Sequence, residues 1–317
     1  MGLNKVELGQ VLHTLRELGI SFQYVGPHQT IVKVCSLLHK EPSGLYYYNG
    51  TDPGIFHDLL RSVVICRDVN VQDLGTNAAL LVEMDPQEAF YRLCTSLFHT
   101  TPRPGIHPTA IIGPEAVIGT DVHIGPYAVI GRCTIGAGSI IHGHVVIMDG
   151  CRIGERVTIE PHCCIGATGA VWMWSEQGER LILPQLGGVD IGNDVFLSTD
   201  VAIVRGLLNE DTRIGARTMI APGSKIGHSV TIEPDCHLAN NVSLAGSAYI
   251  GAGSFLGSGS SVRSHARLAP DTVVGSGAAV VKNVEQPGTT IAGVPAQELQ
   301  VSKAQRKGVP RGLRRQN

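Results

Sequence analysis

The 317-residue sequence is poor in aromatic and charged residues, which make up 5% and 16% of it. Its formal net charge is only −2, so it lacks the basic excess of a general nucleic-acid-binding protein. It contains no apolar run near the roughly 18 residues that a membrane-spanning helix requires, and no signal peptide is recognisable. We therefore expect a soluble cytoplasmic protein without a membrane span.

Paired CxxC spacings are also missing, although the chain has eight cysteines. We predict that these are small buried or half-buried thiols in a reducing compartment. Glycine, in contrast, is abundant at 39 residues. Much glycine together with few aromatics is typical of a repetitive solenoid rather than of a conventional globule.

A six-residue repeat with Ile, Leu or Val at its first position runs from residue 106 to residue 281. It is clear in Ile112-Gly-Pro-Glu-Ala-Val, and it returns in Ile214-Gly-Ala-Arg-Thr-Met. Each repeat is too short to bury its apolar face alone, so successive repeats must stack. We predict a mainly β fold, a left-handed parallel β-helix in which three hexads make one triangular coil and the aliphatic residues point inward.

The sequence divides into three segments, of which the repeat forms the middle one. Residues 1–100 read as a small α/β domain, with a helix over 4–18 and a second helix starting at the N-cap Asp85. Residues 101–296 form the β-helix, and residues 297–317 form a short basic tail. The tail is interpreted either as an aid to solubility or as an attraction for a phosphorylated or acidic acyl donor.

The repeat is interrupted at 167–188, where both tryptophans of the protein, Trp172 and Trp174, are found. Excursions from a solenoid often carry an added function. The alternative is a loop or hairpin that seals a subunit interface. The sequence favours neither.

Two pairs of histidines have spacings that matter in a coil of 18 residues. His228 and His265 lie two coils plus one position apart, so both are predicted on one edge, about 10 Å apart along the axis. This arrangement suits an extended thioester arm beside a histidine that takes a proton from an attacking amine, although such histidines can also be solvated or interface residues. His144 and His162 are predicted to stack, and because no third ligand is in register we assign no metal.

Several stretches resemble the UDP-3-O-acylglucosamine N-acyltransferase (LpxD) family over roughly residues 30–296. They include GLYYYN at 44–49, NAALLVEMDPQEAFYRL at 77–93, LPQLGGVDIGNDVFL at 183–197, IGHSV at 226–230 with LAGS at 244–247, and AGVPA at 292–296. The resemblance implies a homotrimer with active sites between subunits. It also implies that the first domain helps to bind the uridine of a nucleotide amino sugar, and that acyl carrier protein is the donor.

Residue by residue, the resemblance places His228 on the catalytic base and His265 on a second histidine near the pantetheine arm. Tyr46 and Asn49 fall on the residues that contact uracil. We further predict that substrate is contacted by Asn240 and Asn241, and the donor by Gly246, Ser247 and Arg263. No bound cofactor is expected; an acyl carrier protein or coenzyme A thioester is the co-substrate.

The chain departs from the family at three places near the expected site. Ala221 replaces the aspartate seven residues before the base, Thr168-Gly-Ala-Val-Trp replaces an Asp-Gly-Phe-Gly-Phe run, and Val204 replaces another aspartate. Three functions therefore stay open. They are long-chain N-acylation in lipid A synthesis, short-chain N-acylation from acyl-CoA for a surface polysaccharide, and a non-catalytic trimeric scaffold or sugar-nucleotide binder.

Overall fold

The computed structural model describes residues 5–50, 52–67 and 74–298. The chain divides into two compact units, Met1–Thr101 and Pro102–Asn317. Nearly all of the basic tail predicted at 297–317 lies outside the described residues. Within the described parts, no helix is both long and apolar enough to pass through a membrane.

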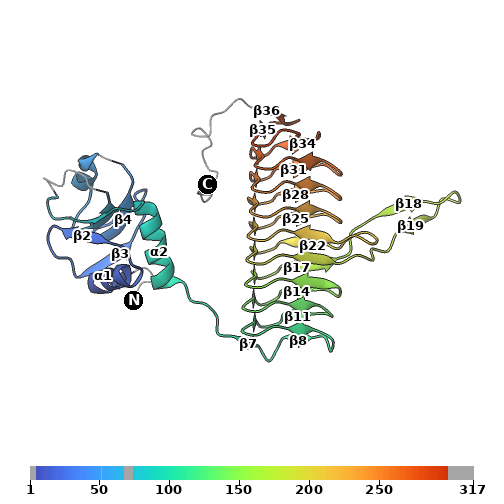
Figure 1. Cartoon of the computed structure of the whole chain (residues 1–317), viewed down its shortest axis with the longest axis horizontal. Coiled ribbons are helices and arrows are strands. Elements are labelled where there is room, and N and C mark those ends of the chain that lie inside the picture. Colours follow the sequence, from blue (N-terminus) through green and yellow to red (C-terminus); the bar gives the residue numbers. More distant parts are fainter. Residues whose placement is uncertain (1–4, 51, 68–73, 299–317) are drawn as a thin grey trace. The chain divides into compact units, whose positions relative to one another are not determined.

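The first unit is a six-stranded sheet in the order β1-β3-β4-β5-β6-β2 (Figure 1). Strands β3 to β6 are parallel, and the edge strands β1 and β2 are antiparallel to their neighbours. The elements are β1 (Lys5–Glu7), α1 (Leu8–Glu17), β2 (Phe22–Val25), β3 (Ile31–Val34), β4 (Gly44–Tyr48), the 3-10 helix η1 (Pro53–Asp58), β5 (Val63–Cys66), β6 (Ala78–Val82) and α2 (Pro86–Phe98).

The two faces of this sheet carry separate apolar clusters because side chains alternate along a strand. Leu45 packs in the cluster formed with α1 and α2, and Tyr47 packs against it. Tyr46 points to the other face, where it packs with Phe56 and Val64. A shift of one residue along β4 therefore decides which layer a tyrosine enters.

The predicted helices of this unit are present, with changed boundaries. The helix expected over 4–18 begins at Leu8, because Lys5–Glu7 pair instead with β3 as a strand. Gly19 follows the helix with a φ of +66°. Asp85 caps α2 as predicted, because its carboxylate accepts hydrogen bonds from the N–H groups of Gln87 and Glu88.

The second unit is a coil of triangular section whose three faces are parallel sheets, and it confirms the predicted β-helix (Figure 1). The eleven-stranded face contains β7 (Gly105–Ile106), β10 (His123–Ile124), β13 (Ile140–Ile141), β16 (Thr158–Ile159), β21 (Phe196–Leu197), β24 (Met219–Ile220), β27 (His237–Leu238), β30 (Phe255–Leu256), β33 (Val273–Val274), β35 (Thr290–Ala292) and β36 (Gln297–Glu298), of which β36 alone is antiparallel.

The nine-stranded face contains β8 (Ile111–Ile112), β11 (Val129–Ile130), β14 (Val146–Ile147), β17 (Cys164–Ala167), β22 (Ala202–Val204), β25 (Lys225–Ile226), β28 (Ser243–Leu244), β31 (Ser261–Val262) and β34 (Ala279–Val280). The eight-stranded face contains β9 (Val117–Ile118), β12 (Thr134–Ile135), β15 (Cys151–Ile153), β20 (Val189–Ile191), β23 (Thr212–Ile214), β26 (Thr231–Ile232), β29 (Tyr249–Ile250) and β32 (Arg267–Leu268).

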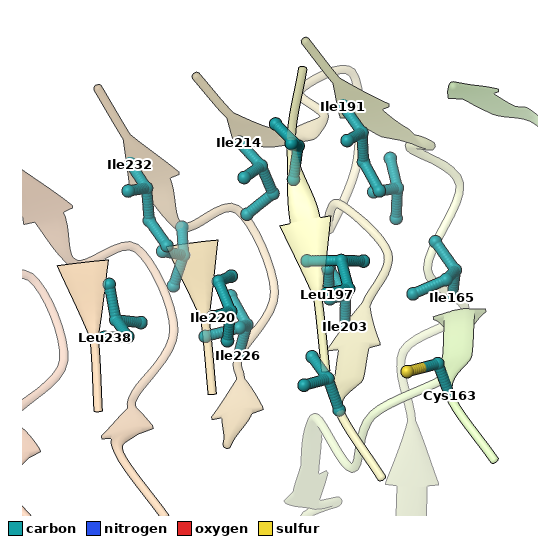
Figure 2. Packing of buried hydrophobic residues seen from close by; sticks show 14 of the residues in the cluster. Cys163, Ile165, Ile191, Leu197, Ile203, Ile214, Ile220, Ile226, Ile232 and Leu238 are labelled. Carbon is teal, nitrogen blue, oxygen red and sulfur yellow. The ribbon is translucent and has the colours of Figure 1, made fainter. Parts of the chain in front are cut away.

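The first-position aliphatic residues fill the interior of the coil, one above another (Figure 2). Ile203, Ile226 and Leu244, for example, are register partners on the nine-stranded face and are all buried. The coil also continues past residue 281, where the repeat is no longer recognisable, because β35 still pairs in parallel with β33.

Truncation of an inward residue is expected to destabilise the protein far more than truncation of its outward neighbour. Ile130 is 1% exposed and Val129 is 38% exposed on the same strand. Ile130→Ala should lower the free energy of unfolding by about 2–5 kcal/mol because it leaves a cavity. Val129→Ala, the matched control, should cost less than about 1 kcal/mol. Urea unfolding followed by circular dichroism measures both, and equal losses would contradict the inward assignment.

All eight cysteines are unpaired, and each is buried or half-buried, as predicted. Burial raises the pKa of the Cys163 and Cys133 thiols to about 11, and that of Cys151 to about 12. At neutral pH these groups are therefore protonated, and they act as packing residues rather than nucleophiles.

Candidate active site

His228 and His265 lie on one corner of the coil, between the nine-stranded and eight-stranded faces. We call residues 227–229, 245–247 and 263–265, which follow β25, β28 and β31, the histidine corner. The N–H of Ser247 donates to the carbonyl of His228 (2.8 Å), and the N–H of His265 donates to the carbonyl of Gly246 (3.2 Å). The two histidines are thus two coils apart on the same edge, as their spacing predicts.

The imidazole of His228 is half-buried and lies against the backbone of Gly246 in the next coil. A Cβ on Gly246 would lie 2.3 Å from Nε2 of the ring, so no other residue fits there without moving the histidine. Nδ1 of the ring is buried and has no hydrogen-bond partner within the described chain. A neutral histidine that accepts a proton at Nε2 carries its own proton on Nδ1, and that proton needs an acceptor.

A five-residue insertion in the coil below contacts Ser229, the residue after His228. Ile203 pairs with Ile226 although this turn of the coil is five residues longer than the next one, from Ile226 to Leu244. The extra residues form the loop 206–210, and its Glu210 carboxylate accepts a hydrogen bond from the Ser229 hydroxyl (2.9 Å). The same hydroxyl accepts from the N–H of Leu207 (3.1 Å). Neither Glu210 nor Ser229 was predicted as a site residue.

The excursion at 167–188 leaves the coil at this same corner. It contains an antiparallel hairpin of β18 (Trp172–Trp174) and β19 (Arg180–Ile182), which stands away from the coil (Figure 1). Its returning end is joined to the insertion, since the N–H of Leu186 donates to the carbonyl of Leu207 and the N–H of Gly206 donates to that of Gly188. The insertion therefore contacts the residue that follows His228, and the excursion is joined to that site through the insertion.

An ion pair holds the base of the insertion. Arg152 donates to the Asp211 carboxylate at 2.6 Å and to Asp190 at 3.2 Å. The Arg152 guanidinium lowers the pKa of the Asp211 carboxyl below its ordinary value. Asp211 also accepts from the N–H of Gly188 at 2.7 Å, so one carboxylate fixes both the insertion and the end of the excursion.

The predicted donor contacts also lie on the histidine corner. Gly246 and Ser247 belong to the coil between His228 and His265, and Arg263 is exposed one coil above them. The hydroxyl of Ser264 donates to the carbonyl of Gly246 (2.7 Å). The structure therefore brings all five of the predicted residues His228, Gly246, Ser247, Arg263 and His265 together along one edge.

The predicted substrate contacts Asn240 and Asn241 are not on this corner. They precede β28 and lie at the opposite edge of the nine-stranded face, as does Ala221 before β25. Ala221 and His228 are thus separated by the width of a face. A carboxylate at position 221 is therefore not placed to orient His228 of the same chain.

The predicted stack of His144 and His162 is confirmed on that opposite corner. Their ring centroids are 5.2 Å apart, and Tyr127 extends the column at 5.2 Å from His144. Each of the three residues has a positive φ at an equivalent corner position. The column is a structural consequence of the repeat, in which equivalent residues lie directly above one another.

The first unit has a pocket of about 740 Å³ at the carboxyl ends of β3 and β4. Such ends are the common ligand-binding edge of a parallel sheet. The residues that line it are Val34, Cys35, Ser36, Leu37, Leu38, Tyr47, Tyr48, Asn49, Gly50, Phe90 and Tyr91. Asn49, predicted to contact uracil, is therefore on the wall of this pocket.

Tyr46 is not on the wall, and its prediction as a ligand contact is wrong. The side chain is fully buried, and its hydroxyl donates to the carbonyl of Glu41 (2.9 Å). Because neighbours on a strand face opposite ways, it is Tyr47 that faces the α2 side, with its ring 5.1 Å from that of Phe90. Tyr47 and Tyr48 are the aromatic residues open to a ligand in this stretch.

Known proteins share the fold and about 30% of the aligned residues. A model of the bacterial transferase hexapeptide (six repeats) family matches residues 132–167 and 211–246. The crystal structure of UDP-N-acetylglucosamine O-acyltransferase (LpxA) from Moraxella catarrhalis superposes with a TM-score of 0.58 and 29% identity, covering 63% of this chain and 75% of that one.

Two UDP-3-O-acylglucosamine N-acyltransferases are closer in sequence. The protein of Herminiimonas arsenicoxydans is 31% identical over 209 residues, which are 58% of this chain and 57% of that protein. The protein of Coxiella burnetii is 31% identical over 251 residues, which are 73% of this chain and 72% of that protein. This chain is therefore a member of the UDP-3-O-acylglucosamine N-acyltransferase family of hexapeptide-repeat acyltransferases.

Proposed function

We propose that the protein transfers an acyl group from a phosphopantetheine thioester to the amine of a UDP-linked amino sugar. The relatives are named as N-acyltransferases of UDP-3-O-acylglucosamine, and this supports a substrate of that type. Our proposal places the reaction in lipid A synthesis, with acyl carrier protein as the donor. The proposal rests on the position of His228. Its ring lies against Gly246, at the corner that also holds His265, the excursion at 167–188 and the insertion at 206–210. A cytoplasmic location remains a prediction.

In the proposed reaction the sugar nitrogen attacks the thioester carbonyl, with His228 as general base for the proton on that nitrogen. A carbon–nitrogen bond forms, the carbon–sulfur bond breaks, and the pantetheine sulfur leaves as the thiol. A backbone N–H of the corner, such as that of Gly246, is placed to donate to the oxyanion of the tetrahedral intermediate. Arg263 and His265, further along the same edge, lie where a pantetheine arm would extend.

We further propose that the active protein is a homotrimer and that each site is shared between copies. Asn240 and Asn241 face away from His228 within one chain, so they can serve as substrate contacts only for the site of a neighbouring copy. In such a shared site a residue of the neighbouring copy would provide the hydrogen-bond acceptor that Nδ1 of His228 lacks within the described chain.

The direct test offers the purified protein UDP-3-O-acylglucosamine with a long-chain acyl carrier protein, beside a panel of acyl-CoAs and other nucleotide amino sugars. Products are followed by mass. The expected result is a gain of one long acyl chain from the carrier protein. Transfer only from a CoA to another sugar would overturn the lipid A assignment, and no transfer in the whole panel would favour a scaffold or binding protein.

The pocket of the first unit is proposed to hold the uracil ring, stacked on Tyr47 or Tyr48 and hydrogen-bonded to the Asn49 amide. Asn49→Ala should then weaken UDP binding by about 1–2 kcal/mol, roughly tenfold, because one polar contact is lost. Isothermal titration calorimetry with UDP measures this change.

Tyr46→Phe is the matched control for that experiment. It removes a hydroxyl that bonds only inside the domain, so it should lower the free energy of unfolding by about 1 kcal/mol and leave UDP affinity unchanged. Weaker UDP binding by Tyr46→Phe together with normal binding by Asn49→Ala would refute the placement of the uracil ring in this pocket.

A further inference from the structure

The hairpin of β18 and β19 exposes apolar side chains on both of its faces. Trp172 and Trp174 are 49% and 59% exposed, Met173 is 62% exposed, and Ile182 is 61% exposed. Trp172 pairs with Ile182 on one face, and Met173 pairs with Leu181 on the other. A two-stranded ribbon in water is marginally stable by itself, so a ribbon with two bare apolar faces requires a cover.

The charged residues of the hairpin are confined to its turn and the residue after it, namely Glu176, Glu179 and Arg180. Two carboxylates at the tip would have to leave water if the tip entered a lipid bilayer, and this disfavours insertion. An apolar shaft with a charged tip instead suits an arm that crosses a protein surface and ends in water. These features favour a second protein surface as the cover.

Among the strands that the structure describes at the height of the hairpin, those of one face alone carry large apolar side chains on the outside. There the outward residues of the eleven-stranded face are Phe196 and Met219, register partners in successive coils, and Met219 is 47% exposed. The outward residues of the eight-stranded face at this height are Asp190 and Arg213. The nine-stranded face presents Ala202 and Lys225.

The hairpin cannot cover Phe196 and Met219 of its own chain. It leaves the coil at the corner between the nine-stranded and eight-stranded faces, and in a triangular section the eleven-stranded face lies opposite that corner (Figure 1). A contact between the hairpin and these residues therefore has to be made between two copies. Cyclic symmetry about an axis parallel to the coil keeps equivalent coils at equal height, so a hairpin reaches the same level on its neighbour.

We propose that the hairpin is an intersubunit arm that lays Trp172 and Trp174 on Phe196 and Met219 of the next copy. The proposal rests on the homotrimer proposed above and names the surface that forms it. On the face that carries Trp172, Trp174 and Ile182, a little over half of three large side chains is exposed, roughly 300 Å². With an equal area on the receiving copy each arm buries about 600 Å², so the arm adds to the contact between neighbouring coils rather than forming a specific interface by itself. Three arms, each donated to the next copy, close a ring.

Because the only two tryptophans of the protein lie in the hairpin, intrinsic fluorescence reports on this element alone. In the assembled protein we expect blue-shifted emission and several-fold weaker quenching by acrylamide than in Met219→Glu. That substitution lies outside the hairpin, so it can expose the tryptophans only through a contact between copies. Arg213→Gln, at the same height on the eight-stranded face, is the control and should leave the emission unchanged, because it adds no carboxylate beside Asp190 and Asp211.

A disulfide experiment fixes the partner. Oxidation of the double variant Trp174→Cys, Met219→Cys should give covalent oligomers on a non-reducing gel, whereas Trp174→Cys with Arg213→Cys should give no more than either single variant. Mixing the two single variants, Trp174→Cys and Met219→Cys, should give covalent dimers. Neither readout uses a substrate, so failure here is distinguishable from failure of the acyl-transfer proposal.

The arm would be refuted by tryptophans that are quenched equally in the parent and in Met219→Glu, or by an assembled protein that forms no specific cross-link. Shielding that arises only on addition of phosphatidylethanolamine–phosphatidylglycerol vesicles would likewise refute it, and would assign the hairpin to a lipid surface.

Discussion

Replacement of His228 by alanine should lower kcat/KM for acyl transfer by about 10²–10⁴-fold, the usual contribution of a general base. The half-buried ring lies on the histidine corner, and the other histidine of its coil, His237, lies away from it on the eleven-stranded face. His265 is two coils away, too far to take over the same proton. Initial rates with the donor and sugar identified by the substrate panel measure the effect.

The matched control is His13→Ala on α1 of the first unit, where the side chain is exposed. It should leave the rate unchanged. The thermal unfolding curve and the oligomeric mass of His228→Ala should match those of the parent, so that a loss of rate is a loss of chemistry. A fully active His228→Ala would remove the base from the proposed mechanism.

Gly246→Ala should reduce the rate by about 10²-fold while the protein stays folded. The added Cβ would lie 2.3 Å from Nε2 of His228, so the imidazole has to move by an ångström or more, and a displacement of that size is costly in a positioned active site. Gly246 has no positive φ, so alanine causes no backbone strain there. Single-turnover rates and circular dichroism separate the two effects.

The double variant Gly246→Ala, His228→Ala tests whether Gly246 acts through the histidine. If Gly246 only seats the ring, the double variant should be as slow as His228→Ala alone, because the two residues then act as one unit. Gly9→Ala, on a helix position where a Cβ meets nothing within 4 Å, controls for a general effect of adding a methyl group. Multiplicative losses in the double variant would show that Gly246 has a separate role.

The coil and the histidine corner were predictable because a fixed period turns sequence spacing into position. The 37-residue interval places His228 and His265 on one edge whatever the residues between them, since equivalent residues stack in every coil. The insertion at 206–210 left a readable signal, because Ile203 and Ile214 are eleven residues apart where a hexad would give six. The contact of Glu210 with Ser229 had no such signal.

Tyr46 shows why the first unit was harder to predict. In the run Tyr46-Tyr47-Tyr48 only the exact register of β4 decides which ring is buried, and no period fixes that register. The sequence of 167–188 likewise mixes ten apolar residues with six glycine, serine and proline residues and shows no clear period. Only the observed pairing of Trp172 with Ile182 and of Met173 with Leu181 shows that both faces of the ribbon are apolar.

The corner that carries His228 has accepted an excursion and an insertion with only one local register shift, between Ile165 and Ala167. Ile165 still pairs with Ile203 across the excursion, and Ile203 with Ile226 across the insertion. New sequence can therefore be spliced in at this edge without repacking the interior, because a corner loop lies outside the stack of aliphatic residues. Evolution or protein engineering can therefore change substrate recognition at this corner while the packing of the coil is kept.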